Sequence, residues 1–131
     1  ISAACTKPRP EIYEGPVVVL VSPDTISSGE GVPMIMDKTG RGTIVSWYGT
    51  NGAFGMVAAL AIMPLDMEIL YPDGASLDEN QSIQMDSNAS RMGGIAPHLR
   101  VPMTDETIAR AMAGEDVQLG YAVQELEKQQ Q

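Results

Sequence analysis

Two adjacent serines lie in a short turn that could carry nucleophilic chemistry. The turn reads Asp-Thr-Ile-Ser-Ser-Gly-Glu over residues 24–30, between an apolar run and a segment of helical pattern. A serine at a sharp strand-to-helix turn has an exposed hydroxyl, and the helix N-terminus places partial positive charge near a developing oxyanion. The backbone N–H of the next residue points to the same place. One of the two serines, Ser27 or Ser28, is therefore a candidate nucleophile.

The same residues are also typical of a helix cap, which carries no chemistry. A serine at the N-cap accepts a hydrogen bond from a backbone N–H of the first helical turn. The Gly-x-Ser-x-Gly motif that marks the nucleophile of α/β-hydrolases is absent from this turn. The residues alone favour Ser27 or Ser28 as a cap, and both interpretations stay open at this point.

The flanking segments predict a β-α-β unit that would position the turn. Residues 16–22 form a β-branched run, which is typical of a strand covered on both faces in a parallel sheet. A helix is predicted from about Ser27 to Lys38, with Gly40 as its stop. Residues 42–49 predict the next strand. We therefore expect an α/β fold with a short crossover helix.

The rest of the chain predicts a hairpin, a long loop and two helices. Apolar segments at 56–63 and 67–72 flank a Pro-Leu-Asp turn. Thr104 and Asp116 are predicted to cap the two helices. The residues spaced for one apolar face of the last helix are Leu119, Val123 and Leu126. The expected divisions of residues 1–131 are a lead-in segment at 1–15, the β-α-β unit with the Ser-Ser turn at 16–49, a Gly-rich turn and hairpin at 50–72, a loop and short strand at 73–103, and helices at 104–131.

Composition and charge exclude several classes of partner. The 131 residues, the size of one domain, carry 8 basic and 17 acidic side chains and a net charge of −9. Phosphate backbones and anionic membrane surfaces are bound by Lys and Arg, so neither nucleic acid nor such a membrane is expected as a partner. The longest apolar run, 54–64, is too short to span a bilayer. Cys5 is the only cysteine, which leaves no internal disulfide and no thiolate metal cluster.

Four blocks of the sequence carry a resemblance to a known family. They are PVVVLVSPDTISSGEG, GRGTIVSWYGTNGAFGM, GGIAPHLRVP and AGEDVQLGYAVQEL. Together they cover nearly the whole chain from residue 15 on, and they resemble the carboxyl-terminal processing, or tail-specific, serine protease family, especially its tricorn-like branch. The resemblance implies a crotonase/ClpP-like ββα-spiral core that is truncated at its N-terminal side. Residues 1–15 contain no signal-peptide pattern and do not begin with Met, so we expect a fragment or a processed product, the C-terminal half of a catalytic domain.

The family pattern assigns roles to the Ser-Ser turn. Its nucleophile is the serine three positions before an acidic residue, which is Ser27 before Glu30. The Ser28 backbone N–H would be one oxyanion donor, and the second donor comes in the family from a Gly-rich stretch further upstream. Glu30 itself is predicted to stabilise the helix end or to bond a neighbouring backbone amide. The residues predicted to shape the substrate cleft are Gly49, Thr50, Asn51 and Gly52.

The general base is where the sequence departs from a common family pattern. Many members use a lysine 25 residues after the serine, a position that Gly52 occupies here. Lys38 is expected at the far end of the helix, about 16 Å from Ser27. His98 is interpreted as a surface or strand-end residue. The tricorn-like branch uses an upstream His, so the resemblance implies a His base from sequence absent here.

A late carboxylate would support that base. Asp86 is the best candidate by its distance in sequence from Ser27, and Glu79 and Asp78 are the others. The alternative for all three is a solvated loop residue or an Asx turn. No metal site and no cofactor are predicted.

The predicted function of the parent protein is serine endopeptidase action on protein C-termini or unfolded segments, through an acyl-enzyme at Ser27. The chain alone is expected to be inactive. Two alternatives remain, a binding or scaffold protein on the same fold with Ser27 as a helix cap, and a crotonase-like enzyme that handles thioesters. A truncated spiral would expose apolar surface, so we expect association with the missing half or with another copy of the chain. The resemblance makes the bacterial periplasm a candidate compartment.

Overall fold

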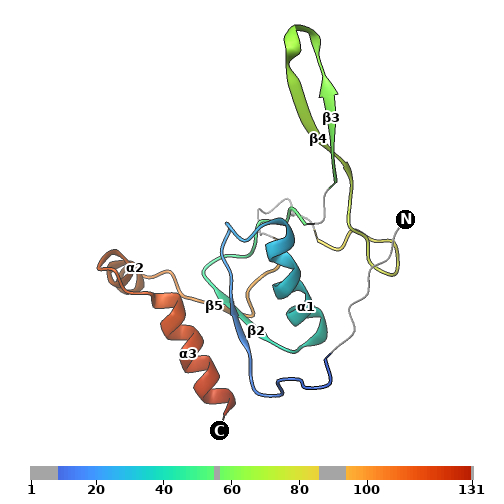
Figure 1. Ribbon diagram of the computed structural model, residues 1–131. Helices are drawn as coiled ribbons and strands as arrows, with labels where there is room; N and C mark the ends of the chain where they lie inside the picture. Colours follow the sequence, from blue (N-terminus) through green and yellow to red (C-terminus); the bar gives the residue numbers. More distant parts are fainter. Residues whose placement is uncertain (1–8, 55–56, 86–93, 131) are drawn as a thin grey trace.

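The computed structural model describes residues 9–54, 57–85 and 94–130 (Figure 1). It contains a three-stranded sheet in the order β1-β2-β5, with both strand pairs parallel. The strands are β1 (Val18–Leu20), β2 (Thr43–Ser46) and β5 (Leu99–Arg100). A separate antiparallel hairpin, of β3 (Val57–Ile62) and β4 (Glu68–Gly74), projects away from this sheet (Figure 1). The predicted mixed α/β class is confirmed.

The predicted β-α-β unit is present. β1 pairs in parallel with β2, and a helical segment connects them. That segment begins as a short 3-10 helix, η1 (Ser27–Glu30), and continues as α1 (Gly31–Thr39). α1 ends at Gly40, whose left-handed conformation (φ 62°) lets its N–H donate to carbonyls of the last turn. The predicted helix end at Gly40 is therefore confirmed.

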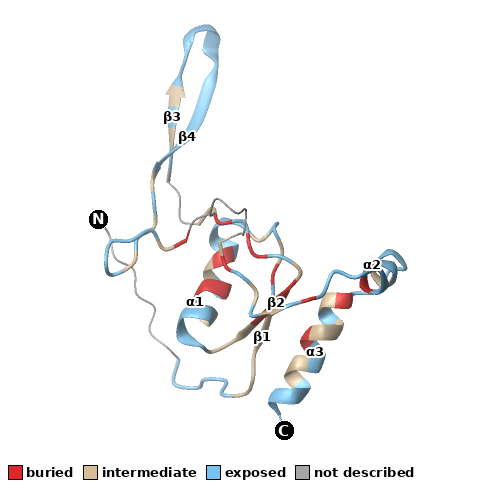
Figure 2. Ribbon diagram, turned by 180° about the vertical axis from the view of Figure 1, so that it is seen from behind, coloured by how far each residue is buried: buried red, intermediate tan, exposed pale blue. Residues whose placement is uncertain are grey.

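Two small apolar cores lie on opposite faces of the sheet. Adjacent strand residues point to opposite faces, so Ile44 and Val45 of β2, both fully buried, enter different cores. The first core, on the α1 side, contains Val21, Met34, Ile44, Met85 and Ile95, and the second contains Val45, Val101 and Val117. Figure 2 shows the buried residues gathered on the sheet and on the helix faces that cover it. β2 is thus covered on both faces, whereas β1, which the β-branched run forms, is only partly covered and has Leu20 42% exposed.

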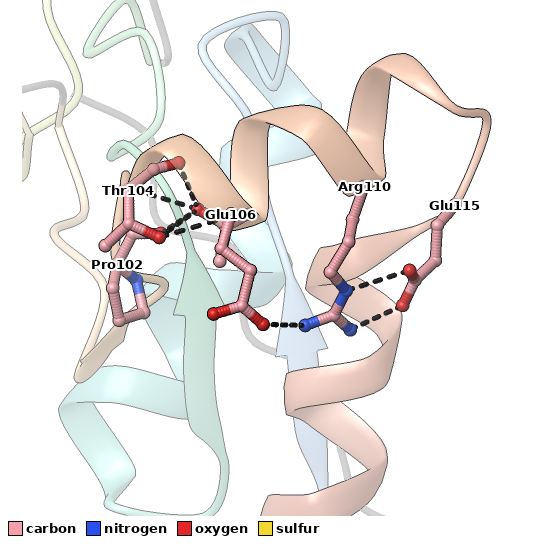
Figure 3. A network of polar contacts seen from close by, with 6 residues as sticks. Pro102, Thr104, Glu106, Arg110 and Glu115 are labelled. Atoms are coloured by element: carbon pink, nitrogen blue, oxygen red, sulfur yellow. Dashed lines mark hydrogen bonds and ion pairs between the residues drawn. The ribbon is translucent and has the colours of Figure 1, made fainter.

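The two C-terminal helices, α2 (Asp105–Met112) and α3 (Val117–Gln129), begin at the predicted caps. The Thr104 hydroxyl accepts a hydrogen bond from the Thr107 N–H at 3.2 Å, and the Thr107 hydroxyl accepts one from the Thr104 N–H at 2.9 Å (Figure 3). This reciprocal pair is a capping box. The Asp116 carboxylate accepts from an N–H in the first turn of α3 at 3.0 Å. Both predicted caps are confirmed.

A charged contact joins α2 to the turn that precedes α3. The Arg110 Nε donates to the Glu115 carboxylate at 2.8 Å, and a second guanidinium nitrogen donates to the other carboxylate oxygen (Figure 3). The hydrogen bonds from Arg110 hold the pKa of the Glu115 carboxyl below its ordinary value. The bidentate geometry fixes the short connection between the helices, although both groups are exposed and the contact adds little stability.

The buried face of α3 differs from the predicted one. Leu119 and Val123 are 48% and 45% exposed, whereas Ala122 is buried. The packed face contains Val117, which is 1% exposed in the second core, and Gln118, whose Oε1 accepts from a backbone N–H and a hydroxyl at the end of β2 at 3.0 and 3.1 Å. The face with Val117, Gln118 and Ala122 thus lies toward the sheet. The prediction of a packed face that contains Leu119, Val123 and Leu126 is therefore wrong for its first two members.

The predicted hairpin is confirmed, and it exposes apolar side chains. β3 and β4 pair antiparallel with Leu60 opposite Leu70, and η2 (Pro64–Asp66) joins them. Leu60 is 50% exposed and Leu70 71% exposed, and Figure 2 shows the hairpin as mostly exposed. An isolated two-stranded hairpin is only marginally stable in water. The association with another chain or segment stays a prediction. None of the described helices is long and apolar enough to cross a membrane.

Candidate active site

Ser27 lies on an exposed turn in a strained backbone conformation. The chain leaves β1, turns through a hydrogen bond from the Thr25 N–H to the Ser22 carbonyl at 2.9 Å, and reaches Ser27 at the start of η1. Ser27 has a φ of 56°, in the left-handed region that residues with a Cβ rarely adopt. This conformation costs about 1–2 kcal/mol. Such strain gathers at functional sites, where the surrounding structure holds it.

Neither serine of the turn is a helix cap. The N-cap residue of η1 is Ile26 and that of α1 is Glu30, and neither makes a side-chain cap hydrogen bond. Within the described ranges, the Ser27 and Ser28 hydroxyls make no hydrogen bond. The cap interpretation, which the residues alone favour, is therefore wrong. It fails because Ser27, in the left-handed region, is itself the first residue of η1, so the N-cap position falls on Ile26.

Two backbone donors of the turn, the Ile26 N–H and the Ser28 N–H, have no partner among the described residues, and the Ser28 N–H is the one that follows Ser27. The Ser27 N–H before it donates to Glu30 Oε2 at 3.2 Å, and the Gly29 N–H after it donates to the Ile26 carbonyl at 3.1 Å. The Ser28 N–H thus remains available beside an exposed serine hydroxyl. A free N–H next to a nucleophile is what an oxyanion hole requires.

A Gly-rich turn, residues 49–52, is bound directly to the Ser27 turn. The Asn51 N–H donates to the Thr25 carbonyl at 2.9 Å, and the Gly52 N–H donates to Glu30 Oε1 at 2.6 Å. Gly52 has a φ of 93°, which a residue with a Cβ adopts only with strain. The structure thus brings together two turns whose joined residues, Glu30 and Gly52, are 22 positions apart.

The four predicted cleft residues differ in what they present to solvent. Gly49, Thr50 and Gly52 are buried, and Asn51 is exposed. Thr50 is fixed to the core, because its N–H donates to the Ile95 carbonyl at 3.0 Å and its hydroxyl accepts from the Ile95 N–H at 2.8 Å. Asn51 is therefore the only side chain of the four that faces solvent, and the role of the turn in a substrate cleft stays a prediction.

Glu30 is the residue whose role the sequence defines least. Its side chain is 0% exposed, and its two carboxylate oxygens accept from the Ser27 and Gly52 N–H groups. The predicted bond to a neighbouring backbone amide is confirmed at Ser27. The bond to Gly52 was not predicted, because no local pattern links a side chain to an amide so distant in sequence. The sequence offers one indication of a special role, since Glu30 is an acidic residue directly before an apolar helical segment.

Two of the three predicted supporting carboxylates, Asp78 and Glu79, lie in the loop between β4 and β5. Asp78 Oδ1 accepts from two backbone N–H groups of its own loop, both at 2.9 Å, so the Asx-turn interpretation is confirmed for this residue. Glu79 is exposed in the same loop, and Asp86 lies outside the described residues. Within the described part of this loop, Leu77 and Ile83 form an isolated antiparallel bridge. In the described ranges, no group of three His, Cys, Asp or Glu is placed to hold a metal ion.

His98 lies at the start of β5 and serves the sheet. Its Nδ1 accepts from the Ile44 N–H at 3.0 Å, and its Nε2 contacts Asp37 Oδ1 at 2.8 Å. The first bond requires Nδ1 without a proton, so Nε2 carries the hydrogen and donates to Asp37. The imidazole thus extends the short ladder of β5 and ties it to α1. The geometry agrees with the interpretation of His98 as a strand-end residue.

Replacing His98 with alanine is expected to lower the free energy of unfolding by about 1–3 kcal/mol, because the Ile44 N–H loses its acceptor. Urea unfolding followed by circular dichroism measures the loss. His98→Asn is the matched control, since its amide oxygen can approach the position of Nδ1 and recover part of the stability. A His98→Ala protein that keeps full stability but no longer reacts with a fluorophosphonate would instead identify His98 as the general base.

Comparison with known proteins adds the family. Peptidase family S41 matches residues 3–101, a span that contains the Ser27 turn, the Gly-rich turn and His98. A search of curated proteins gave no match. The match confirms the resemblance to carboxyl-terminal processing proteases and supports serine peptidase activity in the parent protein. The chain belongs to peptidase family S41.

Proposed function

We propose that Ser27 is the nucleophile of a serine endopeptidase of the carboxyl-terminal processing type, which acts on protein C-termini or unfolded segments. One observation carries the proposal. An exposed serine with φ 56° lies beside the Ser28 N–H, which has no partner in the described part of the chain. Membership of peptidase family S41 supports the same chemistry.

The proposed reaction proceeds through an acyl-enzyme. Ser27 Oγ attacks the carbonyl carbon of the scissile peptide as its proton passes to a general base, and the carbonyl oxygen becomes an oxyanion that accepts from the Ser28 N–H. The C–N bond then breaks, and the base returns the proton to the leaving amine. Water attacks the ester by the same route, which releases the new C-terminal carboxyl group and restores the Ser27 hydroxyl.

The general base is proposed to be a His from another segment of the parent protein. His98 is engaged with Ile44 and Asp37, and Lys38 lies in the last turn of α1, the end opposite Ser27. Asp86 remains the first candidate for a supporting carboxylate and Glu79 the second. A base from elsewhere means that this chain alone is inactive.

The wider architecture is proposed by resemblance. A parallel sheet with helices on both faces is compatible with a crotonase/ClpP-like ββα-spiral of the tricorn-like branch, of which this chain would be the C-terminal part. The exposed apolar hairpin and the half-exposed Leu119 and Val123 favour association with the rest of the domain or with a second copy. The reaction needs no cofactor.

The proposal is tested by incubating the longest natural protein that contains these residues with a peptidase substrate and, separately, with a thioester, and by measuring the products of each. Casein, an unfolded protein, is expected to acquire new N-termini, detected by mass spectrometry, while acetyl-coenzyme A releases no thiol. Thiol release without cleavage of casein would favour a crotonase-like thioester enzyme. A folded protein that acts on neither substrate would favour a scaffold, although the loss of the cap interpretation removes one support for that alternative.

A further inference from the structure

We infer that Glu30 is a positioning residue for the proposed reaction. Its buried carboxylate holds the Ser27 turn and the Gly-rich turn in the arrangement that leaves the Ser28 N–H free for the oxyanion. This role rests on the proposed function of Ser27. Glu30 acts through backbone groups of the site and does not contact the reacting atoms.

Glu30 is a fully buried carboxylate, which is rare in a protein interior and requires strong hydrogen bonds or a charged partner. Its side chain is 0% exposed, and no Lys, Arg or His of the described residues forms an ion pair with it. A buried carboxylate without a cation is destabilising unless its oxygens accept strong hydrogen bonds. The two N–H donors, one on each oxygen, supply those bonds, and the N-terminal end of α1 adds a favourable dipole. An apolar side chain of similar size at this position would give the fold at least the same stability. The carboxylate is therefore explained by the bonds that it makes.

The planar carboxylate fixes the distance between the two turns. Oε2 accepts from the Ser27 N–H at 3.2 Å, and Oε1 accepts from the Gly52 N–H at 2.6 Å. Because the two oxygens are held by one carbon, neither turn can shift without losing a bond. The third link, from the Asn51 N–H to the Thr25 carbonyl at 2.9 Å, lies on the other side of Ser27 in the sequence.

The bond to Ser27 also selects which N–H faces the substrate. The Ser27 N–H is held by Glu30 and the Gly29 N–H by the Ile26 carbonyl, so the Ser28 N–H between them is left without a partner among the described residues. The same bond helps to hold Ser27 at φ 56°, against the strain of the left-handed region. Loss of the Glu30 carboxylate is therefore expected to misplace both the hydroxyl and the oxyanion donor.

The experiment compares Glu30→Gln and Glu30→Asp with the original sequence in the longest natural chain. Gln has the same size, but its amide group must place an NH₂ against one of the two N–H donors. Asp is one methylene shorter and cannot reach both turns. The probe is a fluorophosphonate, whose concentration dependence separates the affinity (KI) from the rate of attack by Ser27 (kinact). We expect kinact to fall about 10–100-fold, because small misplacements at a nucleophile have effects of this size, while KI changes less than about threefold.

Thr107→Val is the matched control for a purely structural effect. Thr107 is 4% exposed in α2, and its hydroxyl donates to the Pro102 carbonyl at 2.7 Å. The change removes buried hydrogen bonds of the capping box far from the Ser27 turn. We expect a lower melting temperature with an unchanged kinact.

The outcomes are distinguishable. If the original protein reacts at Ser27 and Glu30→Gln reacts at the same kinact, the role of Glu30 is overturned while the proposed function stands. If the folded original does not react, both are overturned. Should Glu30→Gln fail to fold, Glu30→Asp decides by the same criterion. If neither variant folds, Glu30 is required for the fold and the positioning role is overturned.

Discussion

Replacing Ser27 with alanine is expected to lower kcat/KM for casein cleavage by the parent protein by roughly 10⁴-fold or more, the usual effect of losing a serine nucleophile. The loss should lie in kcat, because the Ser27 hydroxyl is exposed and makes no hydrogen bond within the described residues. Its removal therefore leaves the packing of the turn intact. The melting temperature is expected to stay within a few degrees of the original value.

Ser28→Ala is the matched control for this experiment. The change keeps the backbone N–H that the proposed oxyanion hole uses, and it removes a hydroxyl to which the mechanism gives no role. We expect kcat/KM to fall by less than about tenfold. The reverse pattern, with Ser28→Ala inactive and Ser27→Ala active, would move the nucleophile to Ser28.

Replacing Gly94 with alanine is expected to lower the free energy of unfolding by about 2–3 kcal/mol through overpacking. A Cβ at this position would lie 2.5 Å from the Met85 side chain and 2.8 Å from the Gly52 Cα. Met85 is flexible and can move, but Gly52 is backbone and is bound to Glu30 at 2.6 Å. The displaced Gly52 should weaken that bond, so a slower fluorophosphonate reaction is expected together with the loss of stability. Urea unfolding and kinact are the two measurements.

Gly120→Ala is the control for the substitution itself. Gly120 lies inside α3, and a Cβ there meets nothing within 4 Å. Alanine is the better helix former, so stability should rise by up to about 1 kcal/mol with kinact unchanged. Equal stability of Gly94→Ala and the original protein would show that the approach of Gly94 to Gly52 is not close in solution.

The sequence predicts the elements of this fold well because their signals are local. The β-branched run, the left-handed stop at Gly40, the caps at Thr104 and Asp116 and the Pro-Leu-Asp hairpin each depend on a few neighbouring residues, and the structure contains all of them. The Ser27 turn is predicted as a site from the same kind of local signal. The cap interpretation is wrong because helix-cap preferences do not predict a left-handed residue at the first position of η1.

The contacts that the sequence does not reveal are those between distant segments. Glu30 meets Gly52 only because β1 and β2 pair in parallel and bring their following turns to one edge of the sheet. The packed face of α3 contains Val117 and Gln118, which contact the second core and the end of β2, rather than Leu119 and Val123. The bond from the Ile44 N–H to His98 likewise follows from the register of β5. None of these contacts leaves a periodic pattern in the sequence.

The identity of the nucleophile is tested most directly by fluorophosphonate labelling of the longest natural chain, followed by peptide mass mapping. The expected result is a single adduct on Ser27 that Ser27→Ala abolishes and that appears in proportion to the loss of casein cleavage. An adduct on a different serine, or no adduct on a folded protein that still cleaves casein, would contradict the assignment of Ser27 as the nucleophile.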